Sequence, residues 1–271
     1  MNTPRRAATI LVLRDRPSQP QSPAQTPAQT PIDPVEVLLV RRGHRASFMA
    51  NAYVFPGGRV DDSDSQPTPD WTTQRCAARE LSEEAGLRVH DLSDLVPFAR
   101  WITPSAEPKR FDTDFFLWAM PADQTPVVDE KEVFDLRWLS PRAAIRAYAD
   151  DGLNLPPPTV CTLEDLQAEI DRTLRDRVPG TSLLSQLLQS CRRRQPVVLL
   201  PRLRGSAGGG IEIVMPWDPE FAATPGEGDP QTCLAQHGAP VDSRISRCAI
   251  DPPGVWRFAR APIVNQSNQE P

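Results

Sequence analysis

The 271-residue chain lacks the features that mark several large classes of protein. No apolar run approaches the roughly 18 residues that a membrane-spanning helix needs. The five cysteines form no CxxC pair, and the apolar run near the start is broken too early, by Arg14 and Asp15, for a signal peptide. We therefore expect a cytoplasmic protein with reduced thiols and no membrane partner.

Histidine and net positive charge are also scarce. The chain has three histidines, no HExxH and no GxSxG motif, which leaves little material for histidine-dependent catalysis. Its net charge of −5 argues against a general nucleic-acid binder.

What the sequence does have is a well-delimited acidic helix. Asp70 can cap a helix over residues 71–85, Gly86 can close it in a left-handed turn, and no Pro or Gly lies between them. Three of its small or apolar residues would face the core: Ala77, Ala78 and Leu81.

Three carboxylates share one face of this helix. Glu80, Glu83 and Glu84 are spaced i, i+3 and i+4. Two carboxylates about 5 Å apart repel by roughly 3 kcal/mol at an effective dielectric constant near 20. The face is therefore either bathed in water or holds a cation, and a hard divalent ion such as Mg²⁺ prefers oxygen ligands.

Upstream of the helix, residues 55–58 read FPGG. We interpret this stretch as the end of an apolar strand running into a double-glycine turn at Gly57 and Gly58. Backbone amides can approach a ligand closely at such a turn.

Gly58 and residues 79–87, RELSEEAGL, resemble the signature of the Nudix hydrolases, GX5EX7REUXEEXGU, where U is aliphatic. All seven specified positions of the second half match. Gly58 and Arg79 are 21 residues apart where the signature has 14, so seven residues are inserted, and we expect them in the loop over 61–70. The signature's first glutamate has no clear counterpart, and the available substitutes are Asp61, Asp62 and Asp64.

The resemblance implies an α/β fold, a Nudix-type α/β/α sandwich with a mixed sheet, over residues 1–150. Strands are expected at 7–13, 35–40, 52–55, 95–102 and 111–120, with a second helix over 142–150. The Pro-rich stretch 17–34 is predicted to be a disordered insertion.

Residues 151–271 are predicted to form an α-rich extension packed on this domain. Two helices are expected, one around 163–174 and one around 181–191, followed by strands at 197–200 and 211–215. We interpret the glycine-rich stretch Gly205–Gly210 between those strands as a flexible hairpin connection, and we predict no fold beyond residue 217.

The activity implied by the resemblance is hydrolysis of a diphosphate linkage in a nucleoside diphosphate attached to another moiety. The metal, Mg²⁺ or Mn²⁺, would be held by the three glutamates of the helix, Glu80, Glu83 and Glu84. Arg79 would fix these glutamates by hydrogen bonding. Catalysis would use Glu83 together with an acidic residue that orients or deprotonates the water, with Glu132 as first choice and Glu130 as second.

Substrate contacts are predicted at the two glycines and at three basic residues, Arg42, Lys109 and Arg110. Each basic residue could equally belong to a solvated turn or hairpin. Residues 100–121 resemble the subgroup containing the peroxisomal coenzyme A diphosphatase, although Ser47 and Asn51 stand roughly where its signature asks for Arg and Gly. Coenzyme A, acyl-CoA, NADH, ADP-ribose and nucleotide sugars all stay open as substrates.

Two other function classes compete with the enzyme. One is a Nudix-like module that senses a nucleotide without cleaving it, and the other is a scaffold that recruits partners through its Pro-rich stretch. The expected partner is a small nucleotide diphosphate, with neither nucleic acid nor membrane, and a homodimer stays open.

Overall fold

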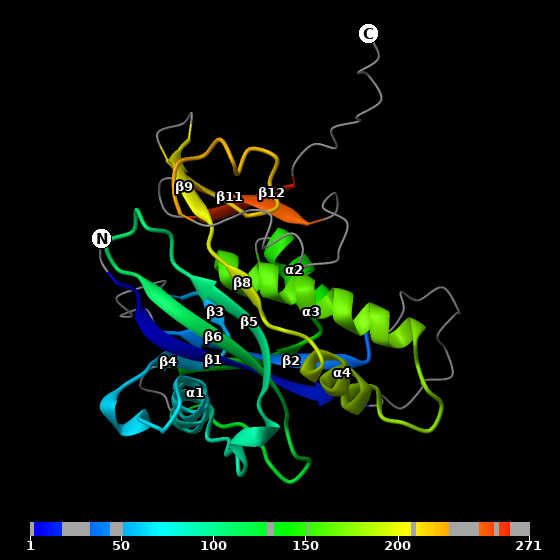
Figure 1. The fold of residues 1–271 in the computed structure, drawn as a ribbon. Coiled ribbons are helices and arrows are strands. Elements are labelled where there is room, and N and C mark those ends of the chain that lie inside the picture. Colours follow the sequence, from blue (N-terminus) through cyan, green and yellow to red (C-terminus); the bar gives the residue numbers. More distant parts are fainter. Residues whose placement is uncertain are drawn as a thin grey trace, which may run out of the picture. The chain divides into compact units, whose positions relative to one another are not determined.

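The structure is a computed structural model that describes residues 3–17, 33–43, 51–128, 133–150, 152–206, 210–227, 244–251 and 255–260 (Figure 1). It divides into two compact units. Unit 1 comprises Met1–Arg5, Arg100–Asp112 and Val197–Pro271, and unit 2 comprises Arg6–Ala99 and Thr113–Pro196.

A mixed sheet forms the centre of unit 2, and it contains the strands that the sequence predicts. Its strand order is β3-β2-β1-β6-β5, with β4 paired to β1 and β7 paired to β2. The strands are β1 (Arg5–Asp15), β2 (Val35–Arg42), β3 (Tyr53–Val54), β4 (Gly57–Arg59), β5 (Val96–Ile102), β6 (Phe111–Ala119) and β7 (Val133–Leu139).

Strand β1 lies in the middle of this sheet because both of its faces are apolar. Ala8, Ile10 and Val12 pack in a cluster with helix α1 (Pro69–Ala85), while Leu11 and Leu13, which point the other way, are also fully buried. Near-continuous apolar runs are typical of strands that are covered on both sides. The sequence signal and the position in the sheet therefore agree.

Helix α1 begins earlier than predicted. Thr68, not Asp70, is the N-cap: its side chain accepts a hydrogen bond from the Trp71 amide, and Pro69 occupies the first helical position. Pro is favoured there because its missing N–H would be unpaired in any case. The predicted end is confirmed, since Gly86 adopts φ 66° and donates its N–H to the Ser82 carbonyl.

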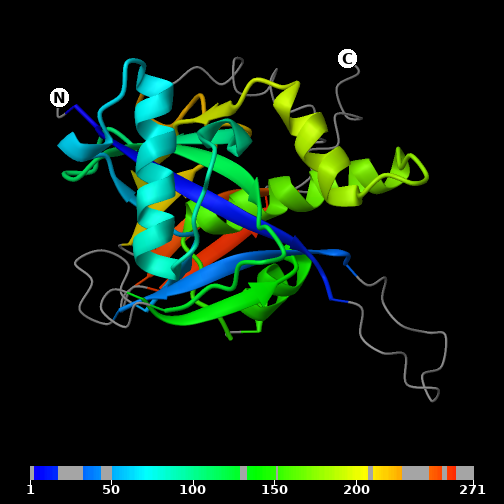
Figure 2. The same cartoon turned by 90° about the horizontal axis from the view of Figure 1, so that it is seen from below.

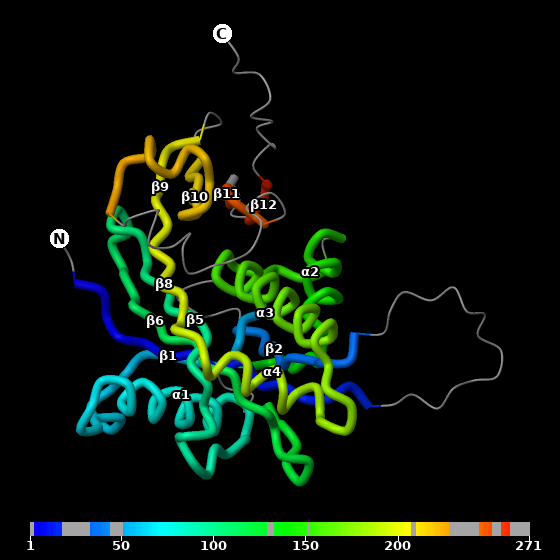
Figure 3. The backbone as a smooth tube through the Cα atoms, turned by 45° about the vertical axis from the view of Figure 1, so that its right-hand side comes forward, coloured from blue at the N-terminus to red at the C-terminus, as the bar shows by residue number. Residues whose placement is uncertain are grey.

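The helices of unit 2 lie on both sides of its sheet. Figures 1 and 3 show α1 on one side and α3 (Pro157–Arg175) on the other, and Figure 2 shows α1 crossing in front of β1. Helix α2 (Pro141–Ala149) has Ser140 as its N-cap and packs against α3, which in turn packs against α4 (Leu183–Arg192). The α/β/α sandwich predicted from the sequence is confirmed. The predicted domain boundary at residue 150 stays a prediction.

Unit 1 holds an antiparallel sheet that sequence analysis found only in part. Its order is β12-β11-β10-β9, formed by β9 (Arg202–Gly205), β10 (Ile211–Val214), β11 (Ile245–Asp251) and β12 (Val255–Arg260); the short β8 (Val197–Leu199) precedes it along the chain. β9 ends where the predicted hairpin connection, Gly205–Gly210, begins, and it pairs antiparallel with β10. Charged and apolar residues alternate along the short β9 and β10, whereas β11 and β12 show no regular alternation that would indicate a strand.

None of the helices within the described ranges is both long and apolar enough to span a bilayer.

The contact between α1 and the sheet can be tested at Leu81, which is fully buried in the core cluster. Leu81→Ala should lower the free energy of unfolding by about 2–5 kcal/mol, because it leaves a cavity between α1 and β1. Urea denaturation measures the loss. The exposed neighbour provides the control: Ser82→Ala should change stability by less than about 0.5 kcal/mol, and similar losses for both variants would contradict this packing.

Candidate active site

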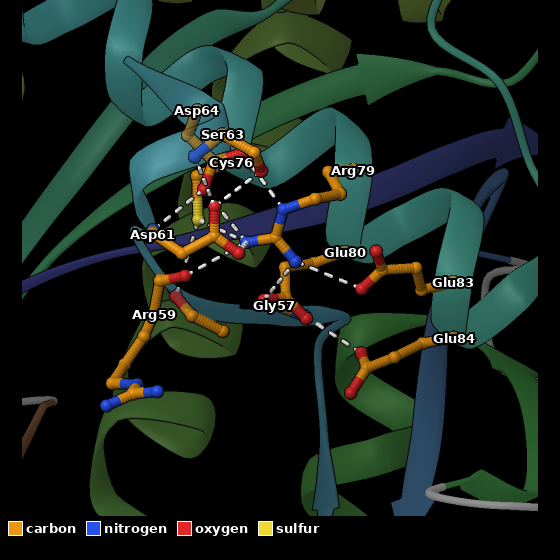
Figure 4. Close-up of polar contacts among 11 residues, drawn as sticks. Gly57, Arg59, Asp61, Ser63, Asp64, Cys76, Arg79, Glu80, Glu83 and Glu84 are labelled. Atoms are coloured by element: carbon orange, nitrogen blue, oxygen red, sulfur yellow. Dashed lines mark hydrogen bonds and ion pairs between the residues drawn. The ribbon is translucent and has the colours of Figure 1, made fainter.

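Arg79, on the third turn of α1, is the centre of the polar contacts drawn in Figure 4. Its Nη1 donates to Glu80 Oε1 at 2.9 Å and to Glu83 Oε2 at 3.0 Å. Its Nη2 donates to the Arg59 carbonyl at 3.0 Å. One guanidinium therefore ties two of the predicted metal ligands to the backbone of β4.

Asp64 holds this guanidinium in place. Arg79 Nε donates to Asp64 Oδ1 and Nη2 to Asp64 Oδ2, both at 2.9 Å, which is a bidentate pair. The Asp64 side chain is 1% exposed, and it also accepts a hydrogen bond from the Asp61 amide in the capping box of the short helix η1 (Asp62–Asp64). Asp64 therefore joins the turn before α1 to the arginine of the signature.

Among the three aspartates offered as substitutes for the signature's first glutamate, Asp64 makes this pair. It stands six residues after Gly58, the same spacing as the glutamate in the signature. Asp61 is exposed and lies 3.8 Å from Arg79. The spacing from Gly58 identifies Asp64 from the sequence alone, but the seven residues inserted after it obscure the match to the signature.

The position of the insertion corrects a second expectation. Fourteen residues separate Asp64 from Arg79 where the signature has seven, and of these only 65–68 lie outside α1. The helix must therefore hold at least three of the additional residues, although all seven were expected in the loop. A helix that grows at its N-terminus leaves the contacts of its later turns unchanged.

The two glycines form a short strand, not a turn. Gly57 and Gly58 belong to β4, which pairs with β1 through Thr9 and Ala8, and neither glycine has a positive φ. A Cβ on Gly57 would lie 2.4 Å from the Ala8 carbonyl oxygen, and one on Gly58 would lie 2.2 Å from Glu80 Oε1. Glycine is needed here because backbone and carboxylate approach each other closely.

Glu84 completes the acidic group. It is buried, and its Oε2 accepts a hydrogen bond from the Gly57 amide at 3.0 Å. Figure 4 shows its carboxylate beside β4, with Glu80 and Glu83 on the adjoining part of the same helix face. The structure thus brings together six of the predicted site residues: Gly57, Gly58, Arg79, Glu80, Glu83 and Glu84.

The buried ion pairs also set the protonation of neighbouring groups. The hydrogen bonds to Asp64 and the charge of Glu80 hold the pKa of Arg79 above its usual range, so this residue stays cationic. Burial, reinforced by the charges of Asp64 and Glu80, raises the pKa of the Cys76 thiol. The Cys76 sulfur lies 3.6 Å from the Gly58 carbonyl oxygen, and the thiol is a neutral, buried packing group.

The contacts described above do not include the other predicted site residues. Arg42 ends β2, and its Nε is buried with no hydrogen-bond acceptor in the described part of the chain. Lys109 and Arg110 belong to unit 1: Lys109 lies over the Phe111 ring, and Arg110 is buried and donates to Glu227 and to the Thr103 carbonyl. The two candidates for the general base, Glu130 and Glu132, fall outside the described residues.

The donor set suits a hard divalent cation in its chemistry. Glu80, Glu83 and Glu84 offer carboxylate oxygens, and two of them already converge on one cationic nitrogen. Within the described ranges, however, no three Asp, Glu, His or Cys side chains stand close enough together to hold a metal ion.

Comparison with known proteins points to one family. The NUDIX domain matches residues 28–156, a range that includes β4, η1 and all of α1. This part of the chain is similar to a NUDIX domain. The bidentate Asp64–Arg79 pair and the three glutamates therefore correspond to a Nudix box that carries a seven-residue insertion.

Named relatives support this assignment. The chain is 31% identical over 178 residues to putative nudix hydrolase 7 of Caenorhabditis elegans, covering 52% of this chain and 59% of the relative. It is 22% identical over 301 residues to the acyl-coenzyme A diphosphatase NUDT19 of Xenopus laevis, covering 74% of this chain and 76% of the relative. The chain thus spans about three-fifths of the length of the first relative.

A solved structure shares the fold. The NUDIX hydrolase of Alicyclobacillus acidocaldarius superposes with a TM-score of 0.50 at 24% identity, covering 62% of this chain and 93% of the other. The sheet and helices of unit 2 therefore form a Nudix fold.

The two glycines of β4 should respond differently to an added methyl group. Gly58→Ala meets the end of the Glu80 side chain, so stability should fall by less than about 1 kcal/mol. Hydrolysis of a diphosphate substrate should fall about tenfold or more, because the carboxylate of a predicted metal ligand is displaced. Gly57→Ala meets the β1 backbone and should cost about 1–3 kcal/mol of stability. Urea denaturation measures the stability and initial rates measure the activity of each variant. Equal losses of stability and of activity in the two variants would contradict this prediction.

Removing the charge of Asp64 should loosen the box. We expect Asp64→Asn to destabilise the domain by about 2–3 kcal/mol, because a buried carboxylate that binds Arg79 in a bidentate pair is lost. Asp64→Asn should also lower the hydrolytic activity, because Arg79 loses its fixed partner. Asp64→Glu keeps the charge and should retain most of the activity that Asp64→Asn loses. Asp61→Asn is the control, since it keeps the cap of η1 and removes only an exposed charge. If Asp64→Asn left the stability unchanged, Arg79 would be held by its other contacts.

Proposed function

We propose that the chain is a divalent-metal-dependent hydrolase that cleaves the diphosphate linkage of a nucleoside diphosphate joined to another moiety. The observation that carries the proposal is the convergence of Glu80 and Glu83 on Arg79, with Glu84 bound to the Gly57 amide of the adjoining strand. This arrangement gathers hard oxygen donors against a glycine-lined backbone, where phosphate oxygens can approach.

In this proposal Glu80, Glu83 and Glu84 hold Mg²⁺ or Mn²⁺. The bound metal neutralises the diphosphate and lowers the pKa of a water molecule. The chain's own contribution is orientation: Asp64 fixes Arg79, and Arg79 fixes two carboxylates on one face of α1. The water oxygen attacks one phosphorus, the bridging P–O bond breaks, and Glu132, or Glu130, accepts the proton.

Among substrate classes, coenzyme A and acyl-CoA have the most support. One relative is named an acyl-coenzyme A diphosphatase. The coenzyme A signature asks for Gly where this chain has Asn51, and Asn51 adopts φ 60°, the left-handed conformation that favours glycine and that Asn tolerates best among the other residues. The backbone conformation is thus compatible with that signature despite the substitution. NADH, ADP-ribose and nucleotide sugars are the alternatives.

The decisive test compares the native chain with Glu83→Gln, in Mg²⁺ or Mn²⁺, on a panel of nucleoside diphosphate derivatives. We expect the variant to lose at least about 100-fold in kcat, because a charged ligand becomes a neutral amide. Turnover in ¹⁸O-labelled water identifies the attacked phosphorus by mass spectrometry.

Ser82→Ala, which changes the exposed residue next to Glu83, is the matched control and should keep full activity. Equal turnover by the native chain and Glu83→Gln would remove the metal-ligand assignment. Tight binding of a nucleotide without turnover by the native chain would instead favour the nucleotide-sensing module.

A further inference from the structure

A second polar cluster lies on the sheet of unit 2, away from the Nudix box. In the strand register, Arg41 of β2 stands opposite Tyr53 of β3 on one side and opposite Asp135 of β7 on the other. Directly opposed residues share a face of the sheet, and so does Arg137, two residues after Asp135. Their neighbours Leu38, Leu136 and Trp138 pack in the core cluster with α1. The polar cluster is therefore on the face turned away from α1.

Arg137 is held rigidly within this cluster. Its Nε donates to Asp135 Oδ2 at 3.0 Å, and its guanidinium lies 4.8 Å from the centre of the buried Tyr53 ring. These are its contacts among the described residues, and its side chain is 47% exposed. The two terminal nitrogens therefore form a preorganised fork that faces solvent, the geometry with which arginine binds planar or tetrahedral anions.

Arg41 supplies a second donor from the neighbouring strand. It stands diagonally across from Arg137, a separation of about 7–8 Å that long side chains bridge readily. Its Nη2 donates to Asn51 Oδ1 at 3.3 Å, and Asn51 is held in the left-handed conformation. Non-glycine residues adopt this conformation rarely, and those that do are often found at functional sites.

The cluster carries an excess of positive charge. Tyr53 donates to Asp135 Oδ2 at 2.5 Å, and burial together with this hydrogen bond raises the pKa of Tyr53 to about 12, so the phenol stays neutral. Although burial opposes it, hydrogen bonds from Tyr53 and Arg137 hold the pKa of Asp135 below its usual value. One carboxylate thus faces two guanidinium groups, and an added anion would balance the remaining charge.

We propose that Arg41 and Arg137 bind a phosphate monoester of the substrate, separate from the diphosphate that is cleaved. The inference rests on the proposed function, because it takes the substrate to be a nucleotide diphosphate. Tyr53 lies four residues before Gly57, so no more than about 13 Å of extended chain separates the cluster from the box. A phosphate monoester carries up to two charges and presents three terminal oxygens, which two separate guanidinium groups can share.

Coenzyme A and 3′-dephospho-coenzyme A test this proposal, because they differ by one phosphate monoester. Binding is measured by calorimetry in Mg²⁺ with the Glu83→Gln protein, so that turnover does not interfere. We expect coenzyme A to bind about tenfold more tightly than its dephospho form, the gain typical of a charge-assisted hydrogen bond. Adding the Arg137→Gln substitution to the Glu83→Gln protein should abolish the preference for coenzyme A and leave the affinity for dephospho-coenzyme A unchanged.

Two further variants make the result specific. Arg41→Gln should also reduce the preference, and it leaves the contacts among Tyr53, Asp135 and Arg137 intact if Arg137→Gln folds poorly. Arg177→Gln removes an equally exposed arginine outside the cluster and should have no effect.

The proposal is overturned if the Glu83→Gln protein binds both ligands equally, or if its preference survives both arginine substitutions in the cluster. The proposed function fails separately, if the native chain turns over neither coenzyme A nor dephospho-coenzyme A nor any other diphosphate of the panel.

Discussion

The bidentate pair between Asp64 and Arg79 is the contact on which the geometry of the Nudix box depends. Arg79 reaches two carboxylates and a backbone carbonyl with the same guanidinium, so its position decides theirs. Without a fixed partner, an arginine side chain would populate many rotamers and would orient nothing. Asp64 removes that freedom because it is buried and is itself held by the capping box of η1. Stability and orientation in this region therefore have a common source.

Close approach between β4 and α1 is the second constraint. The glycines let the strand pass beside the helix so closely that Glu84 receives a backbone amide and Glu80 lies against Gly58. The apolar residues of α1 bury the opposite side of the helix and hold it on the sheet. The packing beneath the helix thus holds the three carboxylates on one face, where Arg79 and the Gly57 amide donate hydrogen bonds to them.

Local features of the site could be predicted from the sequence, whereas features that depend on distant contacts could not. The spacing of Glu80, Glu83 and Glu84 and the glycine cap at Gly86 are properties of one helix, and the structure agrees with them. The choice of Asp64 depends on which loop carboxylate becomes buried against α1, and its only signal in the sequence is the six-residue spacing from Gly58, which the inserted residues obscure. The complete sheet of unit 1 could not be predicted for a related reason: each of its strands is short and is stabilised by its neighbours.

The inserted residues show why the box tolerates a change of length. Seven residues are nearly two helical turns, so lengthening α1 by that amount would rotate its start by only about 20°. Part of the insertion lies in 65–68, and this loop absorbs the remaining mismatch between Asp64 and the helix. All of the added length precedes Arg79, while Glu80, Glu83 and Glu84 follow it. The geometry of the carboxylates is therefore set by the contact of Arg79 with Asp64 and not by the length of chain between them.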